Sequence, residues 1–179
     1  MRSWRAIVSV AGGLAVSGWL MLSGCLGPPI PSDQTLAFDH LALGSIPAPT
    51  ERHTLNDPTL LAAGSLAEAA DWPQLLQMST ADAEQFAQTD MRDAALALIV
   101  RGPLGPGYTV KVQDVRIVSG VVEIGVTLTD PPPGDPGAAY IAWPHDLIRV
   151  ALPVLGVPRG TLWRVVADGE TLMETTYPP

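Results

Sequence analysis

The sequence contains one cysteine, one lysine and few aromatic residues, and it has only one long apolar run. Because Cys25 has no second cysteine to pair with, no disulfide can form within the chain. Lys111 is the only lysine, and 18 acidic residues face 10 basic ones. An acidic surface of this kind argues against a nucleic-acid partner and against electrostatic adhesion to anionic lipid.

The one apolar run extends from residue 6 to residue 22, between the basic start Met1–Arg5 and the stretch Leu22-Ser-Gly-Cys25. A basic start, an apolar middle and small residues before a cut are typical of a secretory signal. The Leu-Ser-Gly-Cys ending resembles the lipobox of bacterial lipoproteins, which implies cleavage before Cys25 and acylation of Cys25. An uncleaved membrane anchor is the alternative, but the run is short for a membrane span and contains glycine.

These features divide the chain into three parts. We expect a lipoprotein signal peptide at residues 1–24, a proline-rich tether at residues 25–35 and a single domain at residues 36–179. Loss of Arg2 and Arg5 with the signal would change the formal net charge from −8 to about −10. Attachment to a membrane would then depend on acyl chains, which hold a protein firmly when two or more are present.

Residues 94–130 are the most regular stretch and predict three consecutive strands. The first, at residues 95–101, is apolar at almost every position, which is typical of a central strand covered on both faces. The second, at residues 108–118, shifts its apolar phase by one residue, so we expect a β-bulge near Gln113 and Asp114. Ser119-Gly120 predicts a two-residue turn before the third strand, which alternates as a strand with one wet face.

Further strands and one or two helices are predicted outside this stretch. Strands are expected at residues 35–45, 59–63, 144–152, 161–167 and 171–177, and Asp168-Gly169 predicts a hairpin turn between the last two. Capping signals at Ser65 and Ser79 predict helices at residues 66–77 and 80–88. The fold class is therefore α+β and rich in β, with a mostly antiparallel sheet or half-barrel and one or two helices on one face.

Several of these segments together resemble the PrcB family, whose members are accessory subunits of a bacterial surface protease complex. The matching segments are Leu98–Gly102, Gly105–Val110, Val121–Val126, Pro131–Gly134 and Pro144–Val150, preceded by Trp72 with Leu75-Leu76 and by Thr89–Met91. Pro106 stands where the family has a glycine, and His145 stands where it has an aromatic residue. The resemblance implies a non-catalytic lipoprotein domain that binds or stabilises a partner protein.

His145 and Asp146 form an adjacent histidine–acid pair, and they suggest a small hydrolase as an alternative. A hydrolase of this kind needs a nucleophile held by the histidine. The sequence has no Gly-x-Ser-x-Gly motif, and Cys25 would be consumed by lipidation. We therefore expect no catalytic residue, and we interpret His145 as a histidine at the start of a strand, beside a solvated aspartate.

Other acidic residues and histidines do not form a recognisable ligand set. His40 and His53 lie far apart without metal-ligand spacing. Asp130 and Asp135 flank a proline-rich loop but do not follow the pattern of a calcium loop. We therefore expect neither a metal nor a cofactor.

The segment between the first two core strands is the best candidate for a partner contact. It comprises Gly102, Pro103, Leu104, Gly105, Pro106, Gly107 and Tyr108. Its glycines permit a chain reversal and its prolines stiffen it, so we expect a projecting hairpin tip with Leu104 exposed beside Tyr108. A phosphate-binding loop is disfavoured because prolines cannot donate hydrogen bonds and a strand, rather than a helix, follows.

The sequence thus predicts a lipid-anchored protein of the cell envelope that binds or stabilises another exported protein, with a protease as the candidate partner. It would lie at the outer membrane or the cell surface if the organism has an outer membrane. A small envelope hydrolase using His145 and Asp146 and a purely structural envelope lipoprotein are the alternatives.

Replacement of the lipidation residue tests the anchoring. We expect Cys25→Ala to move the protein from the membrane fraction to the soluble fraction, because the acyl chains would supply the membrane affinity. Fractionation by ultracentrifugation followed by immunoblotting measures the distribution, with the unaltered protein as the control. A Cys25→Ala protein that has lost its signal peptide and still stays with the membranes would contradict lipid anchoring.

Overall fold

The computed structural model describes residues 33–47, 55, 57–105, 107–133, 141–153 and 156–177. Cys25, His53, Pro106 and Asp135 lie outside the described residues. The elements, in chain order, are β1 (Gln34–Leu36), β2 (Phe38–Ile46), β3 (Thr59–Ala63), α1 (Trp72–Leu75), α2 (Thr80–Ala87), β4 (Ala94–Val100), β5 (Thr109–Val118), β6 (Val121–Thr129), β7 (Trp143–Ala151), β8 (Leu162–Ala167) and β9 (Glu170–Thr176).

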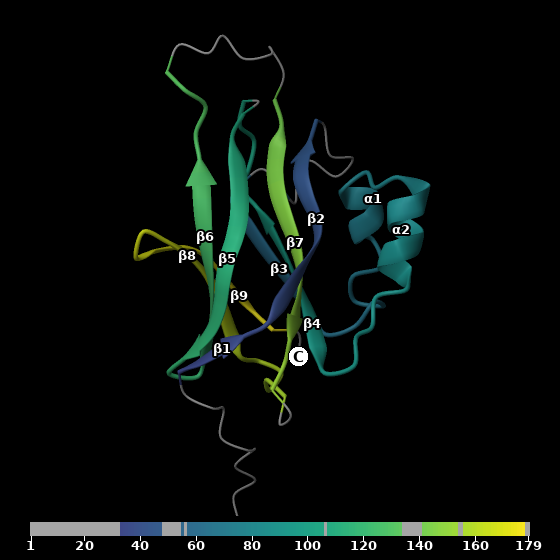
Figure 1. Ribbon diagram of the computed structural model, residues 1–179, viewed down its shortest axis with the longest axis vertical. Coiled ribbons are helices and arrows are strands. Elements are labelled where there is room, and N and C mark those ends of the chain that lie inside the picture. Colours follow the sequence, from purple (N-terminus) through teal and green to yellow (C-terminus); the bar gives the residue numbers. More distant parts are fainter. Residues whose placement is uncertain are drawn as a thin grey trace, which may run out of the picture.

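The strands form two sheets that pack face to face, with the helices against one of them (Figure 1). One sheet has the strand order β2-β7-β4-β3, and the other has the order β1-β5-β6-β8-β9. All neighbouring strands are antiparallel except β6 and β8, which are parallel. The predicted class, α+β and rich in β with helices on one face, is confirmed. The sequence did not indicate that the strands divide between two sheets.

A single run of chain joins the two sheets at one edge. β1 pairs with β5 in the five-stranded sheet, and after Ala37 the chain continues as β2, which pairs with β7 in the four-stranded sheet. Strands that switch sheets in this way form the corners of a sandwich. The strand also begins one residue before its predicted start at Thr35, because Gln34, which the sequence assigned to the tether, pairs with Ile117 of β5.

β4 is the central element of the four-stranded sheet, and its seven residues are all buried. One alternating set, Ala95, Ala97 and Ile99, contributes to the core between the two sheets. The other set, Leu96, Leu98 and Val100, packs under the helices together with Trp72 and Phe86. The sequence predicted both covered faces because a strand that is apolar at every position has no wet side.

The predicted local features of β5 to β9 are confirmed. The pairing of β5 with β6 shifts register between Val112 and Asp114, which is the expected bulge. Both two-residue turns, Ser119-Gly120 and Asp168-Gly169, have positive φ at each residue, as a type I′ turn requires.

The first predicted helix is wrong in length. Only Trp72–Leu75 is helical, and the residues from Leu66 to Asp71 form turns instead. Pro73 explains the difference, because proline lacks the N–H that a helix interior needs and is tolerated only in the first turn, where it lies here. The predicted capping contact still forms, with the N–H of Glu68 donating to the hydroxyl of Ser65. The second helix, at Thr80–Ala87 with Ser79 as N-cap, is close to its predicted bounds.

Gly125 provides a test of the bulge. A Cβ added to Gly125 would lie 2.6 Å from Oδ2 of Asp114 and 3.0 Å from its Cγ. We expect Gly125→Ala to lower the free energy of unfolding by about 1–3 kcal/mol, because the carboxylate must move from its place in the bulge. Urea denaturation of the single variants and of the Gly125→Ala, Asp114→Ala double variant measures the coupling. An equal cost of Gly125→Ala with and without Asp114 would show that this contact is not the cause.

Candidate functional site

The segment from Gly102 to Tyr108 is not the hairpin tip that the sequence predicted. β4 lies in the four-stranded sheet and β5 in the five-stranded sheet, so the segment crosses from one sheet to the other instead of reversing the chain within a sheet. Leu104 is half-buried rather than exposed. Its N–H and C=O each pair with Ala142, at 2.8 and 2.7 Å. The expected projecting contact is therefore held against the body of the domain.

Arg101 fastens the same segment to the ends of two strands. One Nη donates to the carbonyl of Thr129 at 3.1 Å, and the other forms an ion pair with Asp130 at 2.7 Å. The guanidinium also stacks over the ring of Tyr108, with 5.2 Å between its carbon and the ring centroid. Arg101, the first residue after β4, is thus tied to the start of β5 and to the end of β6.

Two glycines of the segment have a conformational requirement. Gly102 and Gly107 have φ of 96° and 86°, a region that other residues rarely adopt. A side chain at Gly107 would in addition lie 3.0 Å from Pro131. The glycines therefore shape a crossing between sheets.

His145 and Asp146 do not form a catalytic pair in this fold. Both lie on β7, and successive side chains of a strand point to opposite faces. His145 packs beside Gly44, and a Cβ on that glycine would lie 3.7 Å from the ring. Asp146 instead points into the space between the sheets. The interpretation of Asp146 as solvated is wrong, because the residue is completely buried.

The buried carboxylate of Asp146 is paired at both oxygens. Oδ1 lies 2.9 Å from Nδ1 of His40 on β2, and Oδ2 accepts the N–H of Val112 on β5 at 2.7 Å. Val112 is the last residue before the bulge, and its N–H points to the edge of β5 that faces away from β6. Asp146 thus connects β7 with β2 and with the opposite sheet, which is a structural role that the sequence did not indicate.

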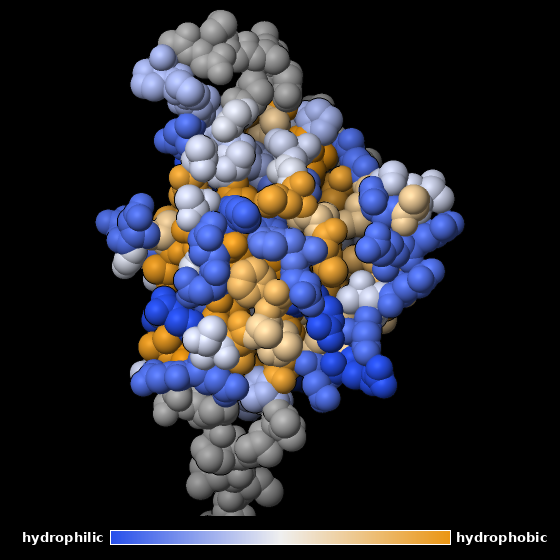
Figure 2. Space-filling model, viewed as in Figure 1, coloured by the Kyte–Doolittle hydropathy of each residue, from blue (hydrophilic) through white to orange (hydrophobic). Residues whose placement is uncertain are grey.

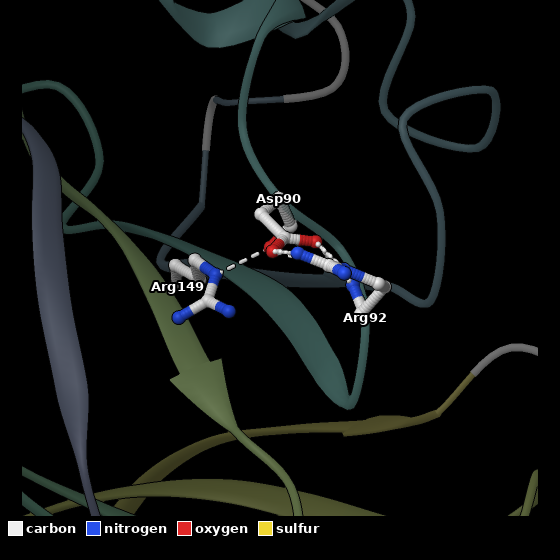
Figure 3. A network of polar contacts seen from close by, with 3 residues as sticks. All are labelled: Asp90, Arg92 and Arg149. Carbon is white, nitrogen blue, oxygen red and sulfur yellow. Dashed lines mark hydrogen bonds and ion pairs between the residues drawn. The ribbon is translucent and has the colours of Figure 1, made fainter.

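A polar cluster at the other end of β7 is also structural (Figure 3). Asp90 binds Arg92 through both carboxylate oxygens, and Nε of Arg149 donates to the carbonyl of Asp90 at 2.6 Å. The hydrogen bond to Arg92 holds the pKa of Asp90 well below its usual range and raises the pKa of Arg92. The Asp90 side chain is therefore ionised at any ordinary pH. The hydrogen bond from Arg149 to the Asp90 carbonyl fastens the segment that precedes β4 onto strand β7.

A groove that the sequence did not predict lies between the edge of β2 and the start of β5. It is lined by Leu43, Gly44 and Ser45 on one side and by residues 107–111 on the other, and its volume is about 420 Å³. Leu43 is 51% exposed. Figure 2, viewed with β5 and β2 in front, shows hydrophobic residues reaching the surface between polar ones on this side of the molecule. Of the predicted contact residues, Gly107 and Tyr108 line this groove.

No family model, curated protein or solved structure matches this chain. Within the described ranges, no group of histidine, cysteine and acidic side chains could hold a metal ion. In the same ranges, no helix combines the length and the apolar character needed to cross a bilayer.

The burial of His145 generates a pH-dependence. Burial lowers the pKa of His145 below its usual value, and the carbonyl of Trp143 and the charge of Asp146 only partly oppose this. The unfolded chain therefore takes up the proton first as the pH falls below about 6.5. We expect full stability above that pH and a loss of at most about 1.4 kcal/mol per pH unit below it.

Urea denaturation between pH 7.5 and pH 5.5, values chosen to bracket the usual histidine pKa of about 6.5, measures this effect. His145→Gln should show a smaller loss over the same interval, because it removes the group whose pKa burial lowers. Equal losses in the two proteins would show that His145 is not responsible.

Proposed function

We propose that this chain is a lipid-anchored accessory domain of the cell envelope that binds or stabilises another exported protein and has no catalysis of its own. The groove between β2 and β5 is the observation that carries the proposal. It is an open, partly apolar surface beside a rigid framework, which is where functional contacts collect.

The position of the groove relative to β1 supports binding away from a membrane. β1 pairs with Val115–Ile117, near the end of β5, whereas the groove lies beside the first residues of that strand (Figure 1). At about 3.3 Å per residue, the two places are separated by roughly 15–20 Å along β5. A domain held through the chain before β1 would present the groove at its far end.

The roles of the polar residues support a binding domain over an enzyme. Asp146 is used to join strands of both sheets, and His145 points to the opposite face of β7. The pair that suggested a hydrolase therefore lacks a shared site. A protease remains the candidate partner because of the resemblance to accessory subunits of a protease complex.

Co-purification from native membranes tests the proposal. The tagged lipoprotein should recover one dominant exported protein in gentle detergent, and a matched control should carry residues 1–35 fused to an unrelated folded domain, so that anchoring is the same. We expect the partner with the complete chain and not with the control. Recovery of the same proteins by both would reject a binding function for this domain, and loss of envelope integrity on deletion would then favour a structural role.

A further inference from the structure

The edge of β2 that faces the groove has unpaired backbone groups. Among the strands that the structure describes, β2 is the last of its sheet and has β7 as its one neighbour. The carbonyl of Pro144 accepts the N–H of Arg101, so Pro144 faces β4 and not its partner Ser45. Because backbone groups alternate in direction along an antiparallel strand, the N–H and C=O of Ser45 and of Leu43 point outward.

The facing edge of β5 is free in the same way. β1 covers β5 at Val115–Ile117, and no other described strand pairs with the first half of that edge. The N–H of Val112 points away from β6, because it donates to Asp146. By the same alternation, the N–H and C=O of Val110 point to the open edge, toward the groove that Val110 lines.

The groove therefore lies between two free strand edges, one from each sheet. A chain in the extended conformation that enters it could form main-chain hydrogen bonds to β2, to β5 or to both. Leu43 and Tyr108 offer apolar surface to its alternate side chains. Such strand addition is a general mode of peptide recognition, in which the backbone gives affinity and the side-chain contacts give specificity.

The charge beside the groove indicates what the extended chain should carry. Among the described residues every arginine has a carboxylate close by: Arg92 has Asp90, Arg101 has Asp130, Arg116 has Asp114, Arg149 has Asp39, Arg159 has Glu68 and Arg164 has Glu123. Lys111 is exposed, lines the groove and is the one lysine or arginine in the described ranges without such a partner. On an otherwise acidic protein, this single unbalanced positive charge is complementary to a carboxylate.

We infer that the groove binds an extended segment of the partner protein by strand addition, and that an acidic side chain of that segment pairs with Lys111. This rests on the proposed function and adds the chemistry of the partner's binding segment. β1 itself lies outside the groove, because it runs with Gln34 beside Ile117 and Leu36 beside Val115, so its start is directed away from the groove.

A synthetic peptide provides the direct test. The probe is a capped, fluorescent peptide of about nine residues, alternating valine and threonine with one central glutamate, since strands commonly have this length. Fluorescence anisotropy against the complete folded domain measures its dissociation constant. We expect saturable binding, about threefold weaker binding when glutamine replaces the glutamate, and loss of binding when alternate amides are N-methylated. A glutamine probe with a free C-terminal carboxylate should bind no better than the capped glutamine probe.

Variants of the protein separate the contribution of the Lys111 charge to binding from the contribution of the backbone hydrogen bonds of β2. Lys111→Gln and Gln113→Glu make the same change in net charge on the same strand, but Gln113 does not line the groove. We expect Lys111→Gln to weaken the glutamate probe about threefold and Gln113→Glu to leave it nearly unchanged. Ser45→Pro removes an outward N–H without removing a bond to β7, and it should weaken both probes at least about threefold at an unchanged melting temperature.

Several outcomes would overturn the inference. The first three are no saturable binding of the probe, equal effects of Lys111→Gln and Gln113→Glu on its binding, and unchanged binding by a folded Ser45→Pro protein. The fourth is a dimer of the unaltered protein that Ser45→Pro dissociates, because a second copy of the chain would then occupy the groove. Co-purification with the same variants separates this inference from the proposed function. A native partner that is still recovered by Lys111→Gln and Ser45→Pro would leave the function in place and reject the groove as its site.

Discussion

The burial of Asp146 is the constraint on which the junction of the two sheets depends. This junction, called the seam below, is the place where β2 and β7 of one sheet approach β5 of the other. A carboxylate taken completely out of water is costly unless its oxygens are paired, and the partners here come from two different strands. His40 must come from β2 and the N–H of Val112 from the opposite sheet. β7, β2 and β5 therefore have to meet at one point, where β5 supplies a donor because the N–H of Val112 points away from β6.

The place of the groove follows from this arrangement. On one side of Asp146 the seam is closed, because β1 covers the far half of β5 before the chain switches sheets as β2. On the other side Asp146 holds the edges of β2 and β5 near each other, and no strand of the described residues lies between them. The opening is thus a consequence of which part of the seam has a covering strand.

The sequence predicted those parts of the fold that depend on local pattern. The uniformly apolar β4, the phase shift before Asp114 and the Asp168-Gly169 turn each leave a direct mark in the order of residues. The division of strands between two sheets leaves no such mark, because a segment that crosses sheets and one that reverses within a sheet use the same glycines and prolines. The pattern of Gly102–Tyr108 therefore predicts a tip although the segment crosses between sheets. The groove depends on edges far apart in sequence, and the sequence shows only the isolated Lys111.

The sheet switch at Ala37 has a mechanical consequence. β1 and β2 form one continuous run of chain, but they are bonded to different sheets, β1 to β5 and β2 to β7. A pulling force applied at Asp33 first loads the short β1–β5 ladder, and once that ladder yields the force passes to the nine-residue β2. The domain would therefore give way in two steps under tension, and the first step would lengthen the chain before β2 and withdraw Leu36 from the core between the sheets while the buried strand β4 stayed in place.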